Sequence, residues 1–421
     1  MPLRNGLVML PVCRRVRLLA ILLLALPLAG CLNTDSTDQT APTVVPPTPA
    51  LSFLAPADLV CPDYITYQQG CGSFGEPQLE VAADGTIWYS AVCCIGQSPP
   101  IWRSHDGGLT FQALPIADGT GTSRDAFGIE GDFAIDTAGN VYFFDISAAS
   151  SYFTKYTADG THVFTKADPF PPIVDRPWVR AGAEDEVFIA YNSGLATWFF
   201  RSTDGGLTWD FANAAQFRCG LGGLGQGFDR NHLTIAACNT VWESFDGGLT
   251  WDAGTPYGGD SVHSGPHPTA YADDNEIVYL PQILANGDNR VLAVATAVET
   301  VEIGPKNGLA NYPWLAAGRP GHVAVAYYAA ENVTKPDEAD AEWYLRVAYT
   351  TDFPNNWTFV TPQAEPVHKG LLGRNLGDFL QLRFAENGDL VIAYASRDGE
   401  LQNRFVRSTG LDMGHAEFRN G

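Results

Sequence analysis

Short polar segments spread along this chain contain side-chain types that bind anions, transfer protons or attack electrophilic carbon. Guanidinium groups hold carboxylates in two-pronged pairs, a carboxyl group donates or accepts a proton, and a phenol activated by a neighbouring base is a nucleophile. The arginines are Arg176, Arg230 and Arg374, the acids are Asp132, Asp175 and Asp378, and the phenol is Tyr312. These seven residues are the candidate catalytic set.

Three further residues are candidates for binding. His263 and His267 lie four residues apart, a spacing that suits a base and its partner, two metal ligands, or ordinary turn residues; we favour the turn. Trp178 follows Arg176 closely and could offer an apolar platform, or simply pack in a core. No cysteine and histidine spacing typical of zinc occurs, and no nucleotide-binding motif is present. We therefore predict neither a metal nor a cofactor.

A repeated phrase indicates how these residues are positioned. Ser104 to Phe111, Ser202 to Trp209 and Ser244 to Trp251 each read Ser-x-Asp-Gly-Gly-Leu-Thr-aromatic. Two glycines allow a tight turn with positive φ, the Asp carboxylate can accept backbone hydrogen bonds, and the aromatic residue then returns to the core. Each phrase therefore predicts a turn between two antiparallel strands.

A second repeat pairs two short strands around a turn. It occurs at 79–89, 133–144, 178–191, 269–280, 314–328 and 379–394, and a shorter unit ends at 232–238. Clear and degenerate turns at Asp106, Asp159, Asp204 and Asp246 are 53, 45 and 42 residues apart. That period is typical of a four-stranded propeller blade. No segment sustains helical periodicity, so we predict an all-β propeller over residues 51–421.

The number of blades depends on one glycine-rich run. Seven blades are preferred, but residues 220–227 contain five glycines and make a poor strand. If that run is a loop, six blades remain. In either case the first strand of each blade lines the central channel, and the loops that enter these strands converge at one mouth. The candidate residues lie close to such strand starts, although Arg230 also lies near the turn before a second strand, which would place it at the opposite end of its blade.

The repeated phrase resembles the Asp-box of the sialidase-type propellers, Ser-x-Asp-x-Gly-x-Thr-Trp. The blade starts at Asp175 and Gly377 are similar to those of exported sialidase-like proteins with such repeats. The resemblance implies that Asp106, Asp204 and Asp246 are structural and lie on the face opposite a ligand. It also implies that a sialidase would need an arginine cluster, an aspartic acid and a Tyr–Glu pair. The family's Arg-Ile-Pro segment before the first box is absent here.

The start of the chain reads as a secretory leader. Four arginines precede an apolar run at 18–28, which is too short to span a bilayer. The ending Leu28-Ala29-Gly30-Cys31 looks like a lipobox. We predict a signal peptide at residues 1–30, and a Thr/Pro-rich tether at 31–50 whose lipidated Cys31 anchors the chain to the cell envelope on its extracytoplasmic side.

Charge and cysteine usage narrow the partners. Removing the leader's four arginines leaves 21 basic residues against 47 acidic ones, a net charge of −26, which disfavours nucleic acid. Six cysteines then remain, an even count that favours disulfides in an exported chain. Cys61–Cys71 and Cys219–Cys238 are the simplest pairs, although six cysteines allow 15 connectivities. Adjacent Cys93 and Cys94 could join each other or different partners.

Three functions fit this sequence. The preferred one is recognition of an extracellular glycan or protein partner at the channel mouth. The first alternative is a sialidase-type exo-glycosidase built from the candidate catalytic set. The second is a uronate polysaccharide lyase, in which His263 or His267 would act with Tyr312 and Arg374.

Overall fold

The computed structural model describes residues 50–63, 65, 75–92, 98–116, 128–146, 150–168, 170, 174–259, 261–262, 269–304, 308–331, 333, 335 and 338–414. All of them belong to one compact unit. The predicted leader, Cys31 and the tether up to residue 49 lie outside the described residues. Within the described ranges, no helix is long and apolar enough to cross a membrane.

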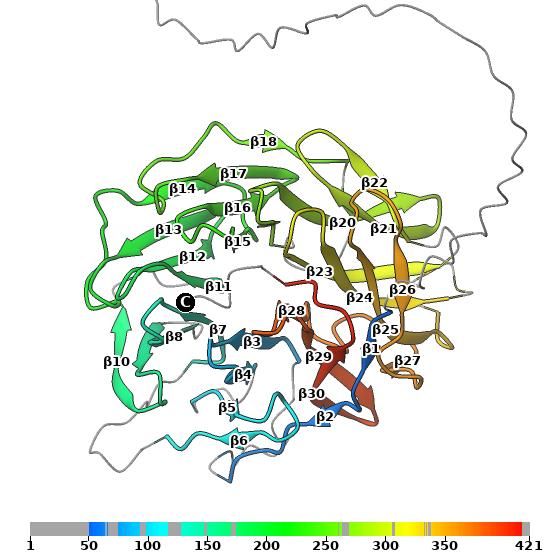
Figure 1. Ribbon diagram of the computed structural model, residues 1–421, viewed down its shortest axis with the longest axis horizontal. Helices are drawn as coiled ribbons and strands as arrows, with labels where there is room; N and C mark the ends of the chain where they lie inside the picture. The colour runs from blue at the N-terminus through cyan, green and yellow to red at the C-terminus, as the bar shows by residue number, and fades with distance from the viewer. Residues whose placement is uncertain are drawn as a thin grey trace, which may run out of the picture. The chain divides into compact units, whose positions relative to one another are not determined.

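Strands account for all the regular secondary structure of the described residues, which confirms the all-β propeller. Four sheets are separate and have four antiparallel strands each, arranged around a common centre (Figure 1). They are β3–β6 (Pro77–Val81, Ile87–Ala91, Ile101–Ser104, Gln112–Ala113), β7–β10 (Glu130–Ile135, Val141–Ile146, Ser151–Tyr156, His162–Asp168), β11–β14 (Asp175–Ala181, Val187–Ser193, Ala196–Ser202, Ala215–Arg218) and β15–β18 (Gly223–Gln226, Leu233–Ala237, Thr240–Ser244, Thr255–Pro256).

The remaining strands form one fourteen-stranded sheet with three successive antiparallel runs. These are β19–β22 (Tyr271–Ala272, Val278–Asn286, Asn289–Ala295, Thr300–Glu302), β23–β26 (Leu309–Ala317, Val323–Ala330, Glu342–Thr350, Thr358–Val360) and β28–β30 (Gln381–Phe384, Leu390–Asp398, Glu400–Thr409). Short contacts join them: β21 pairs with β23, and β27 (His368–Lys369) pairs with both β25 and β29.

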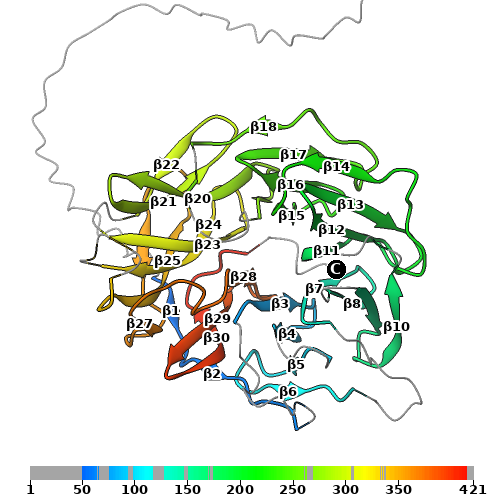
Figure 2. The same ribbon diagram turned by 180° about the vertical axis from the view of Figure 1, so that it is seen from behind.

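The first strands of the runs contact one another in the cyclic order β3, β7, β11, β15, β19, β23, β28 and back to β3. Figure 2 shows the same arrangement from behind. This order is the one expected of seven blades. Because the fourteen-stranded sheet is continuous, the number of blades stays a prediction.

The glycine-rich run corrects one expectation. Residues 223–226 form β15, the inner strand of their sheet, and residues 233–237 form the second strand. Glycine is unusual in a strand, but at position 225 it has a steric cause: a Cβ there would lie 1.7 Å from the Ala270 carbonyl oxygen. A close approach of two backbones therefore requires glycine at this position.

The two ends of the described chain meet in one sheet. Strands β1 (Ser52–Phe53) and β2 (Ala57–Asp58) both pair antiparallel with β30, the last strand. Ser52 lies opposite Thr409, and Ala57 lies opposite Phe405. The ring of sheets is thus closed by hydrogen bonds between the beginning and the end of the described chain.

Alternating residues of the inner strands fill the channel in layers. Each strand contributes every second side chain, as the pleat of a strand dictates. Trp178 and Trp314 have ring centroids 5.5 Å apart, and both contact Phe379. These three side chains are at most 2% exposed. An aromatic layer therefore lies midway along the channel, between the end where the inner strands begin, which we call the mouth, and the end where they finish, which we call the basal end.

The three repeated turns share one hydrogen-bond pattern. In the turn at Asp106, the Ser104 hydroxyl donates to Asp106 Oδ1 over 2.8 Å, the Thr110 amide donates to Oδ1 over 2.9 Å, and the Thr110 hydroxyl donates to Oδ2 over 2.6 Å. Asp204 and Asp246 accept the same bonds. Burial alone would raise the pKa of Asp106, but the hydrogen bonds from Thr110 and Ser104 lower this pKa to about 2.

Each repeated turn also grips the preceding sheet. A Cβ on the second glycine would collide with a phenylalanine ring: Gly108 with Phe405, Gly206 with Phe153, and Gly248 with Phe199. The aromatic residue that ends each turn contacts the same ring, with centroids 5.1–5.2 Å apart. The turn therefore holds a phenylalanine from the third strand of the neighbouring sheet between its glycine and its aromatic residue. We call this contact the phenylalanine clasp.

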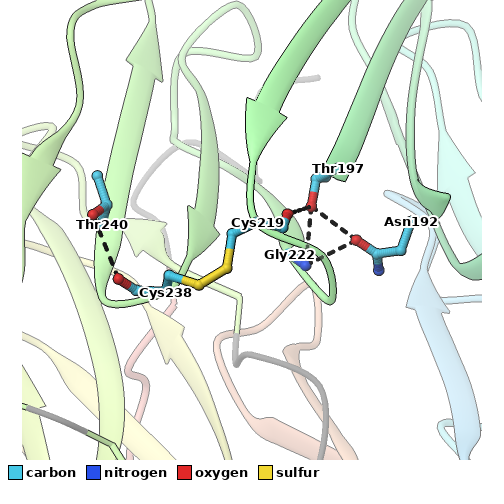
Figure 3. The surroundings of a disulfide bond; sticks show 6 residues. All are labelled: Asn192, Thr197, Cys219, Gly222, Cys238 and Thr240. Atoms are coloured by element: carbon cyan, nitrogen blue, oxygen red, sulfur yellow. Dashed lines mark hydrogen bonds between the residues drawn. A yellow bond between two sulfur atoms is a disulfide. The ribbon is translucent and has the colours of Figure 1, made fainter. Parts of the chain in front are cut away.

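The predicted disulfide between Cys219 and Cys238 is confirmed. It joins the segment after β14 to the turn after β16, and Figure 3 shows its surroundings. The Thr197 hydroxyl contacts the Cys219 carbonyl oxygen and Asn192 Oδ1, each at 2.8 Å. Cys61 is also disulfide-bonded, whereas Cys71, its predicted partner, and Cys93 and Cys94 lie outside the described residues.

Candidate functional site

Charged side chains from different sheets meet at the mouth of the channel. Arg176 Nη1 lies 3.1 Å from Glu76 Oε2 and 3.4 Å from Glu130 Oε1, and Arg176 Nη2 bonds Asp378 Oδ2. Arg374 Nη2 bridges the same carboxylates, at 3.0 Å from Glu76 and 2.9 Å from Asp378. Asp175 Oδ1 lies 3.9 Å from Arg176 Nε. We call these six residues the mouth cluster.

Burial divides the mouth cluster into a hidden part and an exposed part. The side chains of Arg176, Glu76, Glu130 and Asp378 are at most 9% exposed. Asp175 and Arg374 are 55% and 71% exposed. The buried groups form a fixed polar floor, and the two exposed groups are the ones that a ligand can reach.

Two members of the cluster stand on unusual backbone. Glu76 and Arg176 have φ near 55° and each precedes a proline, as does Tyr312 with φ of 50°. Left-handed φ is uncommon for residues with a side chain, and a following proline restricts the backbone further. The pairing of β11 shifts register between Asp175 and Trp178, and that of β23 between Asn311 and Trp314. Strain of this kind concentrates at functional sites.

Electrostatics alter the protonation of the buried acids. Burial raises the pKa of Glu130 to about 8, against the opposing effect of Arg176. Burial also raises the pKa of Glu76. Although burial would lower the pKa of Arg176, the surrounding carboxylates raise it. The cluster therefore places two carboxyl groups of raised pKa beside a permanently charged guanidinium.

The structure brings together Asp175, Arg176, Arg374 and Asp378 of the predicted catalytic set. Tyr312 is 3% exposed, and its hydroxyl donates to the Gly373 carbonyl oxygen over 2.8 Å. Trp178 belongs to the aromatic layer, where its indole N–H donates to the Gly222 carbonyl oxygen over 2.9 Å. Neither ring offers a surface at the mouth.

Two other predicted residues lie farther along the channel. Asp132 is fully buried, accepts a bond of 2.9 Å from Arg180 Nη1 and also contacts Gln381. Arg230 donates to the carbonyl oxygens of Ile135 and Ala181, which end β7 and β11. Arg230 is thus at the basal end, away from Arg176 and Arg374.

The histidine prediction falls outside the described residues, since His263 and His267 belong to segment 263–268. Segments 66–74, 117–127 and 171–173, which precede β3, β7 and β11, also lie outside them. Among the described residues, no group of three or more His, Cys, Asp or Glu side chains suits a metal ion. Asp106, Asp204 and Asp246 bond within their own turns at the basal end.

Sequence reasoning did not select Glu76 and Glu130 as site residues. Both stand at the start of an inner strand, as Arg176 does, and Glu76 shares the pre-proline position of Arg176. A signal was therefore present in the Glu76-Pro77 pair. What the sequence alone does not reveal is that carboxylates from other sheets surround Arg176.

No protein-family model and no curated protein matches this chain. Among solved structures, it is similar to YCF48 bound to D1 peptide, with a TM-score of 0.51 and 12% identity over 86% of this chain and 99% of that one. A GH74 xyloglucanase from Xanthomonas campestris gives a TM-score of 0.48 and 12% identity over 83% of this chain and 54% of that one. A PL25 ulvan lyase gives 0.46 and 10%, over 82% and 95%. At these identities the likeness to YCF48 shows the propeller fold alone.

Proposed function

We propose that the chain is a lipid-anchored, extracytoplasmic propeller of the sialidase-like Asp-box type that binds an extracellular glycan or protein partner at the mouth cluster. The Leu-Ala-Gly-Cys sequence ending at Cys31 supports the anchor and the location. The three matching turns at Asp106, Asp204 and Asp246 support the assignment to the Asp-box type.

One observation favours binding over sialidase chemistry. A sialidase uses its arginines to hold the substrate carboxylate, but the protein's own Glu76, Glu130 and Asp378 occupy the guanidinium of Arg176. Of the other two predicted arginines, Arg374 contacts the same acids and Arg230 lies at the basal end. A carboxylate substrate would have to displace buried ion pairs, which is costly.

The charge of the mouth cluster bears on the ligand. Four carboxyl groups stand against two guanidinium groups, in a chain of net charge −22. Such a site disfavours sialic or uronic acids and favours an uncharged glycan, whose hydroxyl groups Asp175 and Arg374 can bond. A basic segment of a partner protein is the alternative ligand.

Binding can be tested with the purified protein on immobilised neutral glycans, acidic glycans and basic peptides. We expect retention on a neutral glycan, and a loss of affinity of about a hundredfold or more when Asp175→Asn is combined with Arg374→Gln, since each of the two lost hydrogen bonds to a charged group contributes about 1.5–3 kcal/mol. Glu184→Gln, in an exposed turn at the basal end, is the matched control. Retention that depends on sialic acid, or that ignores the double substitution, would contradict the proposal.

Glycoside hydrolysis is the second candidate, and the raised pKa of Glu130 favours it. A carboxylic acid with a raised pKa can act as a general acid beside a second carboxyl group such as that of Asp175, provided that the substrate uncovers the buried Glu130 when it binds. Release of aryl alcohol from neutral aryl glycosides, abolished by Glu130→Gln, would support this candidate. Release from sialosides alone would support the sialidase alternative instead.

A further inference from the structure

A second group of charged side chains lies at the basal end of the channel, beside a largely apolar cavity wall. A cavity of about 120 Å³ is partly open to solvent there. Its lining includes Glu80, Arg180, Gln226, Tyr271 and Arg383, which come from the last residues of the inner strands and from β19. The aromatic layer of Trp178, Trp314 and Phe379 separates it from the mouth cluster.

Two arginines face one tyrosine across this cavity. The guanidinium carbons of Arg180 and Arg383 lie 5.7 and 5.5 Å from the centroid of the Tyr271 ring. Arg180 Nη2 also contacts the Tyr271 hydroxyl at 2.8 Å. Because Arg180 comes from β11, Tyr271 from β19 and Arg383 from β28, the arrangement spans the width of the channel.

One guanidinium is left incompletely bonded. Arg383 is 9% exposed, its Nε lies 3.4 Å from Glu80 and its Nη1 donates to the Leu382 carbonyl oxygen. Arg383 Nη2 is buried and has no hydrogen-bond partner among the described residues. A buried charged donor without a partner is unfavourable. Because Arg383 lines the cavity, a small rotation of its side chain would bring this atom to an acceptor there.

Charged groups of both signs surround the cavity. Arg180, Arg383 and the neighbouring Arg230 stand among the carboxylates of Glu80, Asp132 and Asp136. Gln226 links Arg230 to this site, since its side-chain amide donates to the carbonyl oxygens of Ala181 and Arg230. With Asp136 beside Arg230, three guanidinium groups stand against three carboxylates around the cavity, so an anion would be bound by directed donors and not by a net positive charge.

We propose that the basal cavity binds a small oxyanion, held by Arg383 Nη2 and by the Arg180–Tyr271 pair. The cavity of about 120 Å³ exceeds the ~10–15 Å³ that a single water needs on the same measure, so it has room for a phosphate, a sulfate or a single carboxylate group. Guanidinium groups and a phenol are the donors that such anions prefer. This site is independent of ligand binding at the mouth.

The test is isothermal titration of the purified protein with sodium phosphate, sulfate, acetate and chloride in a buffer of low ionic strength. We expect one saturable site for at least one oxyanion. Preference for phosphate or sulfate identifies a free tetrahedral anion, and preference for acetate identifies the carboxylate end of a larger ligand. Binding of chloride alone, or of none of the four, overturns the proposal.

Substitutions locate the site. Arg383→Gln should weaken oxyanion binding at least tenfold, Arg383→Lys should restore part of it, and Arg397→Gln, an exposed arginine on β29, should leave it within twofold. If Arg383→Gln does not fold, Tyr271→Phe replaces it, with an expected loss of about threefold. Equal weakening by the Arg383 and Arg397 substitutions would mean that the anion binds by general charge, and would overturn the assignment.

Discussion

Glu130 is a side chain whose folded environment opposes its charge. Its pKa rises from 4.5 in the unfolded chain to about 8 in the folded one, mainly through burial. A raised folded pKa means that the associated stability is fully present below pH 4.5 and is lost as the pH rises through 8. Glutamine has nearly the same shape and does not titrate, so Glu130→Gln should gain stability relative to the native protein as the pH rises.

Urea unfolding at pH 6 and pH 9 measures this difference. We expect the free energy of unfolding of Glu130→Gln to exceed that of the native protein by a larger amount at pH 9 than at pH 6. A difference that stays constant or shrinks between these two values would mean that Glu130 is already ionised in the folded protein.

At the scale of the element, the phenylalanine clasp makes each repeated turn a joint between sheets. Gly206 has φ of 86°, and a Cβ there would lie 2.0 Å from the Phe153 ring. Gly194 has a similar φ of 64° but nothing within 4 Å of a Cβ. Gly194→Ala should therefore lower the free energy of unfolding by roughly 1–2 kcal/mol, the cost of a left-handed backbone for a residue with a Cβ. Gly206→Ala should lower it by about 1–3 kcal/mol more, because the added methyl group overpacks against the Phe153 ring.

Chemical denaturation of the two alanine variants gives the comparison. Because the backbone conformations are alike, the difference between the two losses isolates the clasp. Equal losses would show that the Phe153 ring moves aside without cost, and that the turn does not lock the sheets together.

At the scale of the whole molecule, β1 and β2 close the ring by pairing with β30. A chain that begins at residue 61 lacks both strands and also the buried Leu51. We expect its melting temperature to fall on the order of 5 °C below that of a chain beginning at residue 50. The exposed edge of β30 should also promote self-association, visible as an earlier elution in size-exclusion chromatography. Unchanged melting and elution would mean that the ring closes without these strands.

The sequence could predict those parts of the fold whose interactions lie within a few consecutive residues. The turn at Asp106 has all its hydrogen-bond partners between Ser104 and Thr110. The paired strands around residues 84 and 138 follow from turn residues that separate two runs rich in β-branched and aromatic residues. Strand β15 was missed because the glycine at position 225 is required by a close contact with Ala270, 45 residues away. The local composition of a segment contains no information about such a distant contact.

The candidate site also has a part that sequence could predict and a part that it could not. Sequence could select four residues because each lies at or near the start of an inner strand: Asp175, Arg176, Arg374 and Asp378. It could not predict the ion pairs between them, since Arg176 and Asp378 are 202 residues apart. Arg230 precedes the second strand of its sheet, and its position at the basal end became clear only when β15 was identified as the inner strand.

The phenylalanine clasp gives the ring a direction that matters whenever the chain folds as it emerges from its N-terminal end. The turn at Asp204 contacts Phe153 and the turn at Asp246 contacts Phe199, so in both cases the phenylalanine emerges before the turn that holds it. The turn at Asp106 is the exception, because its ring is Phe405, about 300 residues downstream. Contacts between such distant residues form slowly. The first repeated turn to emerge is therefore the last to be engaged, and Gly108 in the sheet of β3–β6 has no phenylalanine partner until nearly the whole chain has emerged.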